Sequence, residues 1–298
     1  IYLDNAATTR PHPQVLDKVQ LCLSENFGNP SSTYPLGVKA RRVIDAARKS
    51  LANIFNVPQA GVIFCGSGTE SDNLALKGIL GSPQRITGRL ITTRLEHSAV
   101  IKTAEWLEQR GTTIDFVQID PQTGQVDLNH LEELVQPETR LVSIQHVNSE
   151  TGIIQDLCAI SKTVKKKNPQ TFIHSDGVQA FSKFSIDLQL LGIDFYSISG
   201  HKFHGIKGAG ALIMNRKTPL EAIIHGGGQE FDLRSGTENV AAIAGMGKAA
   251  ELACSTIKEN YHRVAAFSDE IKNYLSHHFE DMRFVDAPSA LPHIISLS

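Results

Sequence analysis

The sequence predicts an α/β fold built on a mostly parallel sheet that helices cover on both faces. Short apolar runs typical of strands alternate with segments of helical periodicity along most of the chain. With 298 residues, 41% of them hydrophobic, the chain is long enough to bury a large core and a smaller second one. We therefore expect a large domain over 13–240 and a smaller α+β domain formed by 1–12 and 241–298.

The first third of the chain is expected to begin with helices. After a short opening strand, helical periodicity covers 13–26 and 36–55, on either side of a turn-rich segment at 28–32. Strands and helices then alternate. Seven strands are expected at 62–65, 90–93, 113–118, 141–146, 171–175, 194–198 and 209–214, with helices at 70–78, 99–109, 128–135 and 157–166.

The last part of the chain changes character. Two long amphipathic helices are expected at about 240–258 and 261–279, followed by strand-like residues at 283–285 and 294–298. This pattern is typical of the beginning of a second α+β domain. Because the final strand has no helix after it to cover its face, we expect the natural sequence to continue beyond Ser298.

Charge and composition exclude several classes of protein. A net charge of −2 and a pI of about 6.7 provide no basic field for a nucleic-acid backbone. No stretch approaches the ~20 apolar residues that span a bilayer, and the chain begins without a basic and apolar leader. We expect a cytoplasmic protein with no nucleic-acid or membrane partner. The four cysteines show no metal-binding spacing, so reduced thiols and no metal site are expected.

The strongest functional signal is Lys202, in the sequence Ser-Gly-His-Lys that directly follows the strand expected at 194–198. A lysine packed between a buried strand and small residues can be held desolvated, which favours the neutral amine that forms a Schiff base. Asp176, at the end of an earlier strand, could pair with a pyridinium nitrogen and keep that ring protonated. Together these residues predict a covalent pyridoxal phosphate site.

A phosphate cup is predicted where Gly68 and Thr69 follow a strand and precede the helix that opens at Glu70. Such a turn directs free backbone N–H groups and the positive end of a helix dipole at an anion. The chain has neither the dinucleotide fingerprint nor a Walker A loop, and a plain helix cap is an alternative interpretation. Ser199 and His201 add two donors beside the lysine, which favours the phosphate site.

Two further side chains fit a flat ring. His97 follows the strand expected at 90–93, at the edge of an α/β sheet where ligands bind, and could stack on the ring. Gln179 lies three residues after Asp176 and could reach the phenolic oxygen of the ring. A capping histidine and an exposed first-turn glutamine are the alternatives.

The motifs of this chain resemble those of cysteine desulfurases of the NifS/IscS type, in the class V aminotransferase group of fold-type I pyridoxal phosphate enzymes. They occur in the family's order from one end of the chain to the other. They are YLDNAATT (2–9), FGNPSS (27–32), GTESDNLAL (68–76), EH (96–97), HSDGVQ (174–179), SGHK (199–202), KGAGAL (207–212), GGGQE (226–230) and RSGT (234–237). The resemblance implies a large domain with a mostly parallel seven-stranded sheet between helices and a smaller α+β domain.

The resemblance also implies a role for individual residues. Lys202 would form the aldimine with the cofactor, and His97 would stack on the ring and handle protons. Thr237 would reach the phosphate of a neighbouring subunit, which implies a homodimer with shared sites. The full cofactor-binding set implied is Gly68, Thr69, His97, Asn148, Ser149, Asp176, Gln179, Ser199, His201, Lys202 and Thr237.

The implied function is removal of sulfur from L-cysteine through a pyridoxal phosphate aldimine. The products would be alanine and an enzyme persulfide that passes its sulfur to an acceptor protein, for iron–sulfur cluster or thio-cofactor biosynthesis. Two alternatives stay open. One is a cysteine or selenocysteine lyase, or another class V reaction with the same cofactor, and the other is an inactive paralogue that acts as an assembly partner.

The chain departs from the family's pattern in three places. Ser149 stands where the family has a second asparagine that contacts the ring. His204 and Ile206 replace a tyrosine and a proline in the loop after the lysine. The family's catalytic cysteine and its substrate-binding arginine belong to a C-terminal loop that the resemblance places beyond Ser298, and none of the four cysteines here matches by position.

Overall fold

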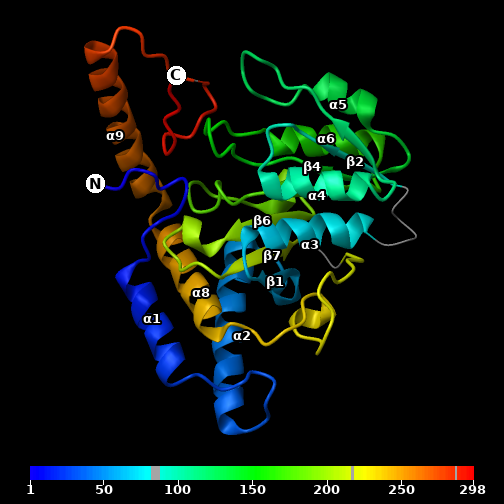
Figure 1. The fold of residues 1–298 in the computed structure, drawn as a ribbon, viewed down its shortest axis with the longest axis vertical. Coiled ribbons are helices and arrows are strands. Elements are labelled where there is room, and N and C mark those ends of the chain that lie inside the picture. The colour runs from blue at the N-terminus through cyan, green and yellow to red at the C-terminus, as the bar shows by residue number, and fades with distance from the viewer. Residues whose placement is uncertain (82–87, 216–217, 286) are drawn as a thin grey trace.

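The computed structural model describes residues 1–81, 88–215, 218–285 and 287–298, and its centre is a seven-stranded sheet (Figure 1). The strand order is β1-β7-β6-β5-β4-β2-β3. β7 pairs antiparallel with both β1 and β6, whereas all other pairs are parallel, so the expected mostly parallel sheet is confirmed. The strands are β1 Val62–Cys65, β2 Arg89–Thr92, β3 Thr113–Phe116, β4 Thr139–Ser143, β5 Phe172–Asp176, β6 Phe195–Ser199 and β7 Gly210–Met214.

Helices cover both faces of the sheet because successive side chains of each strand point to opposite faces. In β1, Val62 and Phe64 belong to the core cluster under α2, α6 and α8, whereas Ile63 and Cys65 belong to the cluster under α3 and α4. Both faces are therefore buried, as the continuous apolar runs of the strands predict. The helices are α1 Pro13–Ser24, α2 Pro35–Phe55, α3 Gly68–Leu80, α4 Ser98–Glu108, α5 Leu128–Leu134, α6 Leu157–Lys167, α7 Leu188–Leu191, α8 Val240–Ser255 and α9 Ile257–His278.

The parallel strands bring their carboxyl ends to one edge of the sheet. β5 ends at Asp176 and β6 at Ser199, and the segments that follow β2 and β4 turn over the same edge. The short 3₁₀ turn Gly200–Lys202 directly follows β6. This edge is where ligands bind in open α/β sheets, and it holds the candidate site.

The N-terminal segment differs from the prediction, because residues 1–4 form no strand and Tyr2 and Leu3 are exposed. Backbone contacts to the turn after β6 hold the next residues instead. The Thr9 N–H donates to the His201 carbonyl at 2.9 Å, and the His12 N–H donates to the His204 carbonyl at the same distance. The expected strand at the N-terminus is wrong because residues 1–4 pair with no strand of the sheet, and the segment is held further along, at Thr9 and His12.

The C-terminal part of the chain consists of α8, α9 and a short irregular tail. α8 packs against α1 and α2, whereas α9 extends away from the sheet (Figure 1). The strand-like segments expected at 283–285 and 294–298 meet in one antiparallel bridge, between Phe284 and Leu297. The division into a large domain over 13–240 and a smaller one formed by 1–12 and 241–298 stays a prediction.

No single helix in the described part of the chain has the length and apolar character to cross a membrane, although α8 and α9, bent by 72° at their junction, meet both criteria as a pair.

Candidate active site

A cavity of about 280 Å³ lies at the carboxyl edge of the parallel strands. Nine of the eleven cofactor-binding residues expected from the sequence line it, and Asn148 and Thr237 do not. The cavity therefore joins segments that are far apart in the sequence. Its lining residues are Ala7, Ser67, Gly68, Thr69, Asp72, His97, Gln145, Val147, Ser149, Asp176, Val178, Gln179, Ser199, His201 and Lys202.

Lys202 reaches the cavity from the 3₁₀ turn after β6. Its Nζ donates a hydrogen bond to the Ala6 carbonyl at 2.5 Å, so the N-terminal segment fixes the position of the amine. Burial lowers the pKa of this amine, while the nearby carboxylates of Asp176 and Asp4 act in the opposite direction. The lowered pKa favours the neutral, nucleophilic form of the lysine.

Asp176 ends β5 and turns its carboxyl group into the cavity. Its Oδ1 accepts a hydrogen bond from the Val178 N–H at 2.9 Å. Burial raises the pKa of this carboxyl to about 7, and the charge of Asp72 adds to the effect, whereas the Val178 bond and the histidines at 174 and 97 oppose it. A buried acid with so high a pKa is a suitable partner for a cation such as a protonated ring nitrogen.

The first turn of α3 forms the other end of the cavity. The Ser67 hydroxyl caps the helix by accepting the Glu70 N–H at 3.1 Å. A Cβ atom at Gly68 would lie 2.7 Å from Val178 Cγ2 and 3.3 Å from Ser199 Cβ, so only glycine lets the helix start this close to the end of β6. The free N–H groups of a first turn and its positive dipole suit a phosphate.

His201 and Ser199 lie beside this turn. The His201 Nδ1 is 3.0 Å from the Thr8 hydroxyl, and burial lowers the pKa of its ring, with Lys202 and Lys207 adding to the effect. Ser199 is buried at the end of β6. The amine, the buried acid and the phosphate-sized set of donors therefore fit the aldehyde, the ring nitrogen and the phosphate of pyridoxal phosphate.

His97 both caps α4 and lines the cavity. Its Nδ1 accepts the Ala99 N–H at 3.1 Å, so in the neutral ring the proton lies on Nε2. The preceding residue fixes this turn, since the Glu96 Oε1 accepts bonds from the Thr93 hydroxyl at 3.1 Å and the Gln145 N–H at 2.9 Å. The capping interpretation and the ring-contacting interpretation are thus compatible.

Gln179 lines the cavity and donates from Nε2 to the Ala6 carbonyl at 2.8 Å. Lys202 donates to the same carbonyl, so one backbone oxygen of the N-terminal segment positions two side chains of the site. The sequence gives no signal for this role of residue 6, because it is made by a backbone atom.

Two residues expected at the site lie elsewhere. The Asn148 Oδ1 accepts the backbone N–H groups of Glu150 and Thr151, and its Nδ2 donates to the Leu95 carbonyl, so this side chain fixes a turn and faces a neighbouring cavity. Thr237 lines a separate cavity beside β1. Ser149, next to Asn148, does line the main cavity.

Asp72 is the main residue that the sequence analysis missed. It lies on α3, is 1% exposed and lines the same cavity as Asp176. A signal was present, since Asp72 is a carboxyl residue on a helix whose neighbours Leu74, Ala75 and Leu76 are all buried. An acid inside such a run is seldom buried without a specific role.

None of the four cysteines lines this cavity. Burial raises the pKa of the Cys22 and Cys65 thiols. It also raises the pKa of the Cys254 thiol, to about 11. None of these three thiols is therefore favoured as a thiolate. Cys158 is partly buried on α6. The described residues also contain no group of three His, Cys, Asp or Glu side chains that could hold a metal ion.

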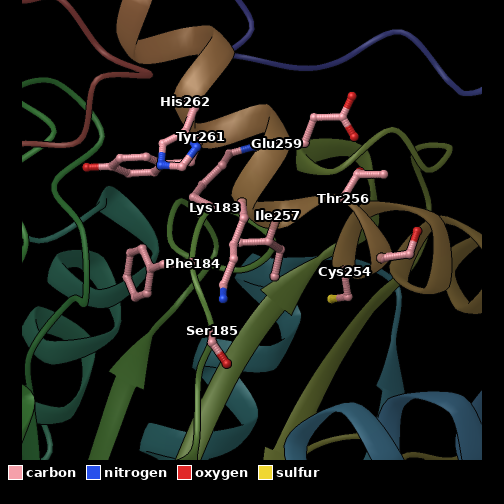
Figure 2. Close-up of a pocket in the computed structure, with 11 residues that line it drawn as sticks. Lys183, Phe184, Ser185, Cys254, Thr256, Ile257, Glu259, Tyr261 and His262 are labelled. Carbon is pink, nitrogen blue, oxygen red and sulfur yellow. The ribbon is translucent and has the colours of Figure 1, made fainter.

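A larger cavity, of about 590 Å³, lies between the loop after β5 and the junction of α8 with α9 (Figure 2). Cys254 and Lys183 both line it. The Lys183 Nζ donates to the Lys202 carbonyl at 3.3 Å, and burial lowers the pKa of this amine to about 8, with the charge of Lys202 adding to the effect. The lining of this larger cavity contains neither Asp176 nor the first turn of α3. The smaller cavity, which contains both, is therefore the candidate active site.

The chain is similar to several known proteins. The family model for aminotransferase class-V matches residues 1–298. A cysteine desulfurase IscS from Methanosarcina thermophila is 38% identical over 91% of this chain, and the chain spans 66% of that relative's length. A solved NifS-like protein superposes with a TM-score of 0.94 at 36% identity, covering 100% of this chain and 81% of that one. A structure of SspA in complex with cysteine has a TM-score of 0.85 at 32% identity, covering 98% and 81%.

Proposed function

Because the chain belongs to the aminotransferase class V family and is similar to its NifS/IscS-type members, we propose that it is a pyridoxal phosphate-dependent cysteine desulfurase. The enzyme would remove sulfur from L-cysteine and release alanine. The observation that supports this most directly is the single cavity that Lys202, Asp176, His97 and the start of α3 share. The similar SspA structure contains cysteine, which supports cysteine as the substrate.

Each end of the cavity would hold a different part of the cofactor. Lys202 would bind the aldehyde carbon, Asp176 the ring nitrogen and Gln179 the phenolic oxygen. The phosphate would bind the donors supplied by Gly68, Thr69, Ser199 and His201. When bound, pyridoxal phosphate supplies a conjugated, electron-withdrawing ring beside the substrate α-carbon.

The chain's own residues would provide the proton chemistry. Burial lowers the pKa of Lys202, which favours its free amine, and a free amine can accept a proton from the substrate α-carbon. The Nδ1 of His97 is used by the Ala99 N–H, so Nε2 is the ring nitrogen through which His97 would exchange a proton inside the cavity. Asp176, once ionised by a cationic partner, would hold the ring in place and sustain its charge.

The surroundings of the site support a homodimer with shared sites. Thr237 does not line the cavity of its own chain, and its loop is tied to α3 because the Arg234 Nε donates to Glu70 Oε1 at 2.7 Å. We propose that Thr237 reaches the phosphate in the partner subunit. We also propose that a sulfur-acceptor protein receives the sulfur in the cytoplasm, for iron–sulfur cluster or thio-cofactor biosynthesis.

Cofactor attachment and turnover test the proposal in sequence. The whole gene product is loaded with pyridoxal phosphate, reduced with borohydride and mapped by mass spectrometry, and the cofactor is expected on Lys202. Lys202→Ala should abolish this adduct, whereas Lys162→Ala, at an exposed position on α6, should retain it. Addition of L-cysteine to the unreduced protein should then yield alanine and a protein-bound persulfide.

A lyase that needs no protein thiol is a second candidate, because no cysteine of this chain lines the cavity. Such an enzyme would release free sulfide equal to the alanine formed and leave no persulfide on the protein. Bound cofactor without turnover of any sulfur amino acid would instead indicate an inactive paralogue. An adduct on a lysine other than Lys202 would contradict all three assignments of the site.

A further inference from the structure

A second buried carboxyl group, that of Asp72, lines the same cavity as Asp176. We propose that Asp72 is a positioning residue that acts through Asp176 and helps to keep a bound ring nitrogen protonated. This inference rests on the proposed function for the identity of the cofactor. It concerns two side chains of this chain that share one cavity, and it can be tested with and without the cofactor.

The position of Asp72 is unusual for an acid. Its side chain is 1% exposed on α3, and its Oδ1 has no hydrogen-bond partner. The nearest basic atom is the His174 Nε2, at 3.4 Å. A buried oxygen without a hydrogen-bond partner disfavours the charged form of the carboxyl group. Such a group is therefore protonated, or its burial has a functional reason.

His174 does not supply the missing charge. It is fully buried on β5, where its Nδ1 lies 2.8 Å from the Ser143 hydroxyl and its Nε2 lies 3.1 Å from the Ser197 hydroxyl. Burial lowers the pKa of the ring to about 4, so His174 is neutral at physiological pH. Ser71 completes the network, with its hydroxyl 2.8 Å from that of Ser197. Asp72 is therefore surrounded by neutral polar groups that fix its position.

The charge of Asp72 acts on the carboxyl group of Asp176. Burial raises the pKa of Asp72 to about 7, and the charge of Asp72 is the second cause, after burial, of the raised pKa of Asp176. Two buried carboxyl groups that line one cavity disfavour joint ionisation in the absence of a cation, so the pair retains a proton near neutral pH. A ring nitrogen that binds Asp176 can take this proton. An N–H bond then forms, a carboxyl O–H bond breaks, and the resulting cation lies near two acids instead of one.

Other titratable groups act on this balance as well, since the histidines at 174 and 97 oppose the raised pKa of Asp176. Burial raises the pKa of Glu96, and both Asp176 and Asp72 add to that effect, so Glu96 contributes no positive charge. The Ser143 hydroxyl on β4 bonds to His174, and the Ala211 carbonyl on β7 accepts a bond from the Ser71 hydroxyl, so both strands contribute neutral partners to the network. The titratable groups that act on the pair from neighbouring elements are His174 on β5, Glu96 and His97 before α4, Tyr196 on β6 and Lys202 after β6.

Asp72→Asn and Asp72→Ser test the proposal in the cofactor-loaded protein. NMR of pyridoxal phosphate labelled at its ring nitrogen measures the fraction of protonated ring as a function of pH. In both variants we expect the midpoint to fall by about one pH unit, a tenfold loss of proton affinity, because one neighbouring negative charge is gone. Glu133→Gln, which removes an exposed carboxyl on α5, should leave the midpoint unchanged.

The two variants separate charge from packing. Asn preserves the volume of the side chain and Ser does not, so a role in packing alone would make them differ, whereas the proposed role makes them alike. Ser also serves as the test if the Asn variant does not fold. Equal midpoints in the wild type and in both variants would overturn the proposal.

The apoprotein gives an independent measurement. Because the pKa values of Asp72 and Asp176 are raised from 3.8 to about 7, the folded state retains protons between about pH 4 and 7 that the unfolded state has released. Stability therefore falls as the pH rises through this window. Urea unfolding at several pH values gives the equilibrium constant of unfolding. Within this window each of the two acids should raise that constant by up to tenfold per pH unit, and Asp72→Asn should lack the contribution of one of them.

The outcomes distinguish this inference from the proposed function. A wild-type protein that binds the cofactor but makes no alanine from cysteine would end the desulfurase proposal, while the NMR midpoints would still decide the role of Asp72. A wild type that binds no cofactor would leave the unfolding measurement to decide it. Identical pH dependence of unfolding in the wild type and in both variants would overturn the pairing of the two acids.

Discussion

Two regions of this molecule bury acidic side chains in opposite ways. Beside β1, Glu230 is 3% exposed and fully paired, since Arg48 donates to its two oxygens at 2.6 and 2.9 Å and the Phe64 N–H donates at 2.8 Å. At the carboxyl edge of the sheet, Asp72 and Asp176 are just as buried, yet no arginine or lysine forms such a pair with them among the described contacts.

The difference separates structural acids from functional ones. A buried charge that is fully paired holds two segments together, and in Glu230 it joins the end of a loop to α2 and β1. A buried acid without a cation has a raised pKa and is ready to receive one, as at Asp176. Burial alone therefore does not identify a site, whereas the missing partner does.

Breaking the paired region should have the largest effect. Arg48→Met keeps much of the side-chain volume but leaves Glu230 buried and unpaired, and we expect a loss of about 3–5 kcal/mol in the free energy of unfolding. Urea unfolding at neutral pH measures it. The double variant Arg48→Met with Glu230→Gln should recover part of the loss, and full stability of the single variant would show that the pair is dispensable.

The unpaired region should respond with the opposite sign. Asp176→Asn removes a buried acid with a raised pKa, so above pH 7 the apoprotein should gain about 2 kcal/mol, less than the full linkage value because the bond from Val178 weakens. The same variant should lose most of its affinity for pyridoxal phosphate. A destabilised apoprotein at high pH would mean that Asp176 has a structural partner after all.

The shape of the phosphate end gives a smaller effect. Gly68→Ala places a methyl group 2.7 Å from Val178 Cγ2 and 3.3 Å from Ser199 Cβ, which shifts the start of α3. We expect affinity for pyridoxal phosphate to fall about tenfold, or about 1.4 kcal/mol, as measured by fluorescence titration of the apoprotein. Unchanged affinity would show that the cofactor does not use this turn.

The smallest change in the free energy of unfolding is expected for an exposed ion pair. Lys102 lies 2.8 Å from Glu105 on α4, but their side chains are 73% and 46% exposed. Lys102→Gln should change the free energy of unfolding by less than about 0.5 kcal/mol, because water screens the pair. A larger change would mean that ion pairing outweighs burial in this protein, which would weaken the contrast between Glu230 and Asp176.

Most of the fold could be predicted because strands and helices have different periods in sequence. The seven strands lie within a few residues of the expected ranges, and Val62–Cys65 matches in full. The largest error concerns residues 1–4, whose apolar character resembles a strand although they form none. Periodicity reports which face a residue can bury, but it does not report which distant partner lies there.

The site was predictable where one motif contains several of its parts and unpredictable where distant segments meet. Asp176 ends a strand, and Gly68 and Lys202 each come shortly after one, so a pattern of residues indicated them. Asp72 was missed because Asp176, which lines the same cavity, is far away in the sequence. Asn148 was expected to bind the cofactor, although its side chain is used in a turn.

The sequence by itself determined the succession of most strands and helices along the chain, the burial of both sheet faces and the residue types at the strand ends. These features follow from local periodicity and turn chemistry. Only the tertiary structure decided which acids are paired, and it placed the Ala6 carbonyl between Lys202 and Gln179. Charge state and position in a buried site depend on all neighbours within a few ångströms, and folding brings those neighbours from every part of the chain.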